Sequence, residues 1–163
     1  MTNILPVDFS LPTSSTTLPY AACSLGFPPQ LVDTIYGAAK IYDTRAGNDP
    51  DFPKELHDDS ELNMIGEAGK EIGTTTGRTR TVNWLNMDKL IKSINMTGSN
   101  YIIISKVDIL KQVNIFKLIH NNVIVPFGSF SEMSQYITSS LHKHCKFVQN
   151  VIYSDSPEYI NIN

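Results

Sequence analysis

Apolar residues spaced three or four positions apart mark three segments of this chain as helices. The spacing predicts helices over residues 28–42, 86–96 and 129–142. Proline suits the first turn of the first helix, Asn86 is a suitable N-cap for the second, and residues 129–132 form a capping box for the third. We expect the apolar face of the first helix to consist of Leu31, Val32, Ile35, Tyr36 and Ala39.

Continuous runs of β-branched and aromatic residues predict buried strands. Residues 101–106 form such a run, residues 113–126 predict a hairpin around Asn121-Asn122, and residues 147–153 predict a last strand. Buried strands that alternate with helices are typical of an α/β fold, so we expect a mixed, largely parallel sheet flanked by helices. In such sheets a ligand crevice lies at the carboxyl ends of the strands.

The remaining segments predict loops within one domain. Residues 1–20 contain prolines and a cluster of hydroxyl side chains, residues 46–60 predict a long surface loop, and residues 61–72 predict a short helix or turn. With 163 residues, of which 41% are hydrophobic, the chain is long enough for a single domain with its own core over residues 1–163.

Composition and charge exclude several classes of function. The net charge is -3 and the isoelectric point is near 5.7, which argues against a general nucleic-acid binder. Cys23 and Cys145 lie far apart and lack metal-ligand spacing, so a reduced, cytoplasmic protein is expected. No apolar run is long enough to span a membrane, so we expect a soluble protein without membrane partners.

The chain contains only three arginines, and two of them lie in one loop. Arg78 and Arg80 follow glycines and threonine hydroxyls in residues 73–80, and Arg45 lies in another turn-like stretch, residues 43–50. Guanidinium groups match carboxylates and phosphates, and glycine lets backbone amides approach a ligand closely. The 73–80 segment is therefore a candidate anion site, although such clusters also occur in ordinary solvated turns.

Two further polar segments follow predicted strands. Asp108 follows the 101–106 strand and could accept hydrogen bonds from the N1-H and 2-amino groups of guanine, while the stem of Lys106 packs over the base. Residues 154–157 form a turn after the last predicted strand. Taken alone, both segments are also typical of ordinary solvated strand ends.

Other polar groups carry less information. His142 and His144 point in different directions on a helix, which favours a frayed helix end over a metal site. The acidic stretch 57–61 is typical of a solvated loop. The sequence contains no glycine-rich loop of the kind that holds a nucleotide triphosphate.

Taken in order, these segments resemble the C-terminal part of adenylosuccinate synthetases. Residues 71–85 are similar to the family signature G-[AST]-T-T-G-R-x-R-x-x-G-W-L, which is long and specific. The shorter matches resemble the family segments T-S-S, T-R-V-G, F-P-T-E, T-K-L-D and S-T-G-P, and they lie at residues 13–15, 44–47, 52–55, 105–108 and 154–157.

The resemblance implies a ligase of AMP biosynthesis that joins IMP to L-aspartate, using GTP and Mg²⁺, and that is commonly a homodimer. It implies that L-aspartate is bound by Thr75, Thr76, Arg78 and Arg80. It implies that IMP is bound by Thr13, Arg45, Ala46, Gly47 and Arg78. It implies that GTP is bound by Lys106, Asp108, Ser154, Ser156 and Pro157.

The departures from the family pattern are equally informative. Nothing in these residues matches the family's N-terminal phosphate loop, its catalytic aspartate or its catalytic histidine, so we expect neither catalytic residues nor metal ligands here. Lys70 stands where many members have asparagine or histidine, Asn83 replaces a glycine, and Ser156 replaces the glycine beside the base.

We therefore expect the C-terminal portion of a larger ligase domain, inactive alone, with a complementary N-terminal polypeptide as its partner. Two alternatives stay open. One is a non-catalytic nucleotide-binding remnant, and the other is a variant ligase that acts on a 2-aminopurine monophosphate with a different phosphate donor.

Overall fold

The structure is a computed structural model of the chain. It describes residues 2–4, 18–47, 49–53, 56, 58–73 and 77–156.

Four parallel strands form the first sheet. In spatial order they are β1 (Thr2–Ile4), β2 (Tyr36–Lys40), β5 (Tyr101–Ser105) and β8 (Asn150–Tyr153). The register aligns Lys40 with Ser105, and the carboxyl ends of β2, β5 and β8 therefore lie at the same edge. Ile102 and Ile104 of β5 are fully buried, as the apolar run predicts for a central strand.

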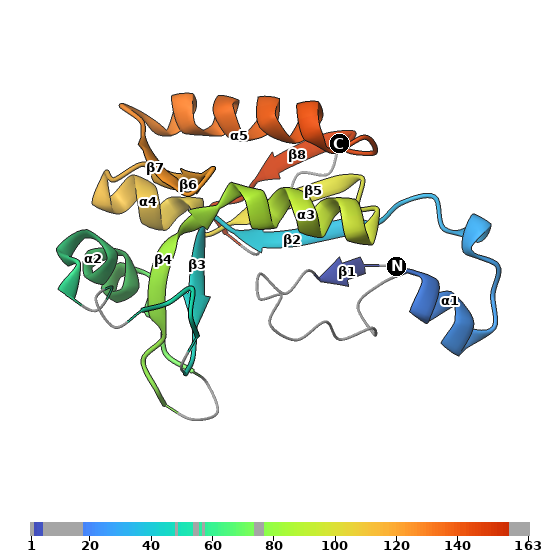
Figure 1. Cartoon of the computed structure of the whole chain (residues 1–163), viewed down its shortest axis with the longest axis horizontal. Helices are drawn as coiled ribbons and strands as arrows, with labels where there is room; N and C mark the ends of the chain where they lie inside the picture. Colours follow the sequence, from blue (N-terminus) through green and yellow to red (C-terminus); the bar gives the residue numbers. More distant parts are fainter. Residues whose placement is uncertain are drawn as a thin grey trace.

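The second sheet is mixed. Its spatial order is β3 (Tyr42–Arg45), β4 (Thr81–Asn86), β6 (Lys117–His120) and β7 (Val123–Pro126). β4 and β6 are parallel, whereas β3 and β7 pair antiparallel with their neighbours. In Figure 1, β3 and β4 extend away from the parallel sheet as a two-stranded arm. The α/β class is confirmed, and its strands are divided between two sheets.

The described part of the chain also contains five helices and a short 3₁₀ turn. They are α1 (Leu18–Leu25), the 3₁₀ turn η2 (Pro29–Leu31), α2 (Ser60–Ala68), α3 (Met87–Thr97), α4 (Val107–Val113) and α5 (Phe130–His144). Helix α2 packs against α4 and β4, and α3 packs against β6 and α5. Figure 1 shows α3 and α5 running side by side along one side of the molecule.

The predicted helix over 86–96 and the helix over 129–142 are confirmed, because local signals define both. The Asn86 side chain accepts a hydrogen bond from the Lys89 backbone N–H at 3.1 Å, and Gly98 ends α3 with φ 67°. Ser129 accepts from the Glu132 backbone N–H at 3.2 Å at the start of α5. Residues 61–72 contain helix α2, as expected.

The predicted helix over residues 28–42 is wrong. After the 3₁₀ turn, residues 36–45 form β2 and β3, and burial alternates with a period of two through Ile35, Gly37, Ala39 and Ile41. Small residues let β2 fit between β1 and β5, and pairing on both sides satisfies its backbone groups. The tertiary pairing overrides a spacing that also fits a helix.

Two other boundaries differ from the prediction. Helix α4 was not expected, and the hairpin consequently begins at Lys117. Lys106 turns β5 directly into α4 through a left-handed conformation, φ 66°, and makes no side-chain cap, so no capping signal marks this helix in the sequence. The last strand begins at Asn150. The hairpin turn is as expected, with positive φ at Asn121 and Asn122.

Candidate functional site

The carboxyl edge of the parallel sheet brings two of the predicted ligand segments together. The Ser154 backbone N–H donates to the carbonyl of Ile104 at 2.8 Å, and the Val107 N–H donates to the Ser154 carbonyl at 3.4 Å. The turn after β8 therefore lies against the turn that contains Lys106 and Asp108.

A buried carboxylate, Glu71, lies at the centre of a cluster of cations at this edge. Its side chain is 4% exposed. Lys40 donates to both carboxylate oxygens at 2.9 and 2.8 Å, and the Tyr42 hydroxyl donates to Oε1 at 2.8 Å. Nη1 of Arg80 is 3.4 Å from Oε2, and Nζ of Lys106 is 3.6 Å from Oε1. Three cations thus share one carboxylate, and we call these five side chains the Glu71 cluster.

The electrostatics of the cluster follow from burial and pairing. Burial alone would raise the pKa of Glu71, but the hydrogen bonds from Lys40 and Tyr42 and the nearby positive charges outweigh it, so the pKa is lowered. Burial lowers the pKa of Lys40 despite its pairing with Glu71. Burial beside the carboxylate holds the pKa of Tyr42 far above its ordinary value. Glu71 is therefore ionised, and the cluster has a surplus of positive charge that favours an anionic ligand.

The threonine-arginine loop is closed at its base by backbone hydrogen bonds. The Arg80 N–H donates to the Glu71 carbonyl at 2.9 Å, and the Gly73 N–H donates to the Arg78 carbonyl at 2.8 Å. These bonds hold Arg80 against Glu71 and place Arg78, which is exposed, farther out along the loop. Thr75 and Thr76 lie outside the described residues.

The third arginine lies near the same loop. Arg45 ends β3 opposite Thr81, the residue next to Arg80, and its Nε is 3.3 Å from Asp49 Oδ2. Ala46 and Gly47 follow it and are exposed. The antiparallel register thus brings the predicted IMP segment beside the predicted aspartate segment. Thr13 lies outside the described residues.

Two residues of the predicted guanine-binding segments, Lys106 and Ser154, make hydrogen bonds to groups of the protein itself. The Lys106 ammonium donates to the Gly69 carbonyl at 2.8 Å, and Asp108 is exposed in the first turn of α4. Ser154 is buried and its hydroxyl donates to the Ser156 carbonyl at 2.6 Å, so this hydroxyl shapes the turn. Pro157 lies outside the described residues.

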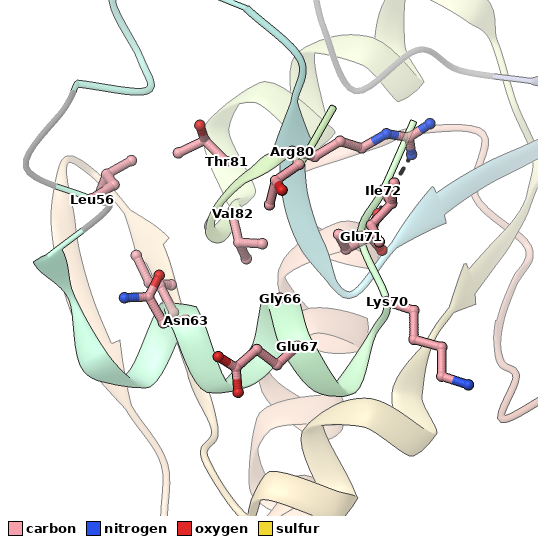
Figure 2. A pocket seen from close by; sticks show the side chains of 12 residues that line it. Leu56, Asn63, Gly66, Glu67, Lys70, Glu71, Ile72, Arg80, Thr81 and Val82 are labelled. Carbon is pink, nitrogen blue, oxygen red and sulfur yellow. Dashed lines mark hydrogen bonds and ion pairs between the residues drawn. The ribbon is translucent and has the colours of Figure 1, made fainter. Parts of the chain in front are cut away.

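A pocket of about 570 Å³ opens beside the cluster, between α2 and β4. Glu71 and Arg80 lie in its wall, and Figure 2 shows the ion pair between them and Lys70 pointing away from the pocket. Lys106 and Ser154 do not line it. The other lining residues are Leu56, Leu62, Asn63, Gly66, Glu67, Lys70, Ile72, Thr79, Thr81 and Val82.

Four members of this site were missed by the sequence reasoning: Lys40, Tyr42, Glu71 and Gly69. A Cβ at position 69 would lie 2.4 Å from the Tyr42 hydroxyl, so Gly69 leaves the space that this hydroxyl needs to reach Glu71. Recognising β2 as a strand was the missing step. Its last residue, Lys40, is in register with Ser105 and would then have been placed beside Lys106.

The described residues contain no group of three or more histidine, cysteine, aspartate or glutamate side chains arranged to hold a metal ion. Within the same residues, every helix is too short or too polar to cross a membrane.

Comparisons with known proteins identify the family of this chain. A family model described as adenylosuccinate synthetase matches residues 8–148, and the chain belongs to this family. It is 39% identical over 107 residues to the adenylosuccinate synthetase of Methanococcoides burtonii, covering 65% of this chain and 25% of that protein. It is 37% identical over 111 residues to the enzyme of Caenorhabditis elegans, covering 66% and 24%. The chain therefore spans about a quarter of the length of these relatives.

Two solved structures share the fold. The fully ligated adenylosuccinate synthetase of Plasmodium falciparum superposes with a TM-score of 0.65 at 18% identity, covering 85% of this chain and 41% of that chain. The succinoaminodeoxyadenylate synthetase of cyanophage S-2L, bound to dGMP and dATP, gives a TM-score of 0.51 at 14% identity, covering 85% and 35%.

Proposed function

We propose that this chain supplies the aspartate-binding loop and the guanine-reading turns of an adenylosuccinate synthetase-type ligase. The reaction joins IMP and L-aspartate at the expense of GTP and yields adenylosuccinate, GDP and phosphate. The observation that carries the proposal is the meeting of Arg80 and Lys106 at Glu71, because these cations come from the two motifs assigned to different ligands.

In this proposal the 73–80 loop binds the carboxylates of L-aspartate. Arg78 and Arg80 supply forked donors, and Thr75 and Thr76 add hydroxyl donors. Holding the amine in line with the reacting carbon of the purine lowers the entropic part of the barrier. Arg78 also reaches the ribose of IMP, whose phosphate and base are bound by Thr13, Arg45, Ala46 and Gly47.

The guanine of GTP lies at the edge formed by the ends of β5 and β8. The exposed carboxylate of Asp108 accepts from the N1-H and 2-amino groups, which adenine cannot offer in this pattern. Lys106 covers the base, and the backbone of the turn at Ser154, Ser156 and Pro157 lies along its edge. This assignment predicts a preference for guanine over adenine.

The chain orients reactants and does not activate them. Phosphorylation of the IMP 6-oxygen requires a phosphate loop, a base and an acid, and none has a counterpart in these 163 residues. Mg²⁺, when bound with GTP, neutralises charge on the phosphates. The described residues do not fit a magnesium site, so we place its ligands in a complementary N-terminal polypeptide. We expect the complete enzyme to be a cytoplasmic homodimer.

The test is a phosphate-release assay of the 163-residue chain with IMP, L-aspartate, GTP and Mg²⁺. We expect no turnover alone and turnover after mixing with the N-terminal part of a relative. Turnover by the isolated chain contradicts this division of roles.

The same assay separates the alternatives. Replacing GTP by ATP, and IMP by a 2-aminopurine monophosphate such as dGMP, tests the variant ligase. A chain that binds neither IMP nor GDP in calorimetry, and gives no turnover with its complement, contradicts the proposed function.

A further inference from the structure

Glu71 connects two segments that belong to different ligands in the proposed function. Arg80 approaches Oε2 from the base of the threonine-arginine loop, and Lys106 approaches Oε1 from the turn between β5 and α4. The same carboxylate is therefore the contact that the two cations share.

The carboxylate itself is held in place and hidden from solvent. Lys40 and Tyr42 use both of its oxygens at 2.8 to 2.9 Å, and Gly69 leaves room for the Tyr42 hydroxyl. Glu71 is 4% exposed, whereas the side chains of Arg80 and Lys106 are 34% and 37% exposed. A ligand can thus reach the two cations, while Glu71 lies behind them.

The long distances to these two cations are informative. Arg80 and Lys106 lie 3.4 and 3.6 Å from Glu71, longer than the bonds from Lys40 and Tyr42. Guanidinium has five N–H donors, and the described contacts of the Arg80 side chain engage only one nitrogen. The remaining donors can bind a carboxylate while the ion pair with Glu71 fixes the direction of the group.

We propose that Glu71 is a positioning residue that fixes Arg80 and Lys106 relative to each other, so that aspartate binding and guanine binding are coupled. The inference rests on the proposed function for the identity of the two ligands. Its physical basis is repulsion: without the carboxylate, Lys40, Arg80 and Lys106 form a group of like charges, and each cation moves to the nearest solvent or carbonyl.

The experiment compares the wild-type chain with Glu71→Gln, which keeps the size of the side chain and removes its charge. Calorimetry measures the affinities for GDP and L-aspartate under conditions where both proteins are folded. The matched control is Glu61→Gln, which removes the carboxylate that pairs with Lys117 outside the cluster. We expect Glu71→Gln to weaken binding of both ligands about tenfold, as expected for a lost charge-assisted contact, and Glu61→Gln to leave both affinities unchanged.

A double-mutant cycle without any ligand tests whether Glu71 couples Arg80 to Lys106. Arg80→Gln and Lys106→Gln, alone and together, are compared by their urea midpoints in the wild type and in the Glu71→Gln background. We expect non-additive shifts in the wild type and additive shifts once Glu71 is replaced.

The outcomes are distinguishable. Unchanged GDP and L-aspartate affinities in Glu71→Gln, with only a lower urea midpoint, would overturn the inference and leave Glu71 a structural residue. If the wild type binds neither ligand and gives no turnover with its complement, the proposed function fails. The urea cycle then decides by itself whether Glu71 couples the two cations, and additive shifts in the wild type would overturn that coupling.

Discussion

Two buried carboxylates near the start of strand β3, Glu71 and Asp43, have opposite environments. Glu71 lies by Tyr42 and receives hydrogen bonds from Lys40 and Tyr42, with two further cations nearby. Asp43 is 4% exposed, and its Oδ1 has no hydrogen-bond partner among the described residues. A cavity of about 210 Å³ beside Asp43 is lined mainly by polar groups, among them Asp51, Asn83 and Lys89.

The difference lies in what surrounds each acid, because both are nearly inaccessible to water. Pairing lowers the pKa of Glu71. Burial raises the pKa of Asp43 to about 7, although the Asn86 backbone N–H and the charge of Lys89 oppose the rise. A buried acid is stable as an anion only where hydrogen-bond donors surround it, and this surrounding of donors makes the Glu71 cluster the candidate site.

Removing the Glu71 carboxylate should have the largest effect on stability. Glu71→Ala leaves Lys40 partly buried without its partner, and we expect the free energy of unfolding to fall by about 3–5 kcal/mol in urea denaturation. Replacing the pair by apolar residues, Lys40→Met with Glu71→Leu, should recover much of this loss. A loss under about 1 kcal/mol in Glu71→Ala would show that the cluster contributes no more than a surface ion pair.

Gly69→Ala should disrupt the same cluster through sterics. The added methyl would lie 2.4 Å from the Tyr42 hydroxyl and push it from Glu71, so overpacking of about 1–3 kcal/mol adds to the loss of a hydrogen bond. In a Tyr42→Phe background the contact with the hydroxyl is absent and the contact with the Ile65 carbonyl oxygen at 3.0 Å remains, so the same substitution should cost less. Equal costs in both backgrounds would contradict the clash.

Asp43→Asn should stabilise the protein at neutral pH, whereas the substitutions in the Glu71 cluster destabilise it. Folded Asp43 keeps its proton up to about pH 7, whereas the unfolded group loses it near 3.8, so its contribution to stability is complete below pH 3.8 and is lost as the pH rises to 7. We expect Asp43→Asn to raise the free energy of unfolding by about 1–3 kcal/mol at pH 8 and to flatten this decline. Unfolding curves measured from pH 4 to pH 8 check the sign, and a wild type whose stability rises over this range through Asp43 would refute it.

Lys106→Gln should have the smallest effect on stability. Its ammonium is partly exposed and 3.6 Å from Glu71, so the loss should stay below about 1 kcal/mol. GDP affinity should nevertheless fall about tenfold, because the stem of Lys106 is proposed to pack over the base and the glutamine side chain is shorter. A large loss of stability with unchanged GDP affinity would reverse its assignment from ligand binding to structure.

The sequence predicted those parts of the fold that local signals define. Asn86 and Ser129 cap α3 and α5, and Asn121-Asn122 makes the hairpin turn, because each effect acts over a few residues. Strand β2 escaped prediction because Tyr-Gly-Ala-Ala-Lys has little strand propensity of its own and becomes a strand only by pairing with β1 and β5.

The site was predictable to a similar degree. The motifs identified Arg80 and Lys106, but no spacing in the sequence connects either residue with Glu71 or Lys40. Their meeting depends on the register of β2 against β5 and on the backbone bonds that close the 71–80 loop, and these are tertiary features.

The most direct test uses the scarcity of arginine in this chain. A ¹⁵N spectrum of the guanidinium groups contains three Nε signals, from Arg45, Arg78 and Arg80. Assigned by substitution, they report each arginine separately during titration with L-aspartate and then GDP. We expect the Arg80 signal to shift with L-aspartate and to shift again with GDP, the second response disappearing in Glu71→Gln. An Arg80 signal that responds to neither ligand would contradict a shared site organised by Glu71.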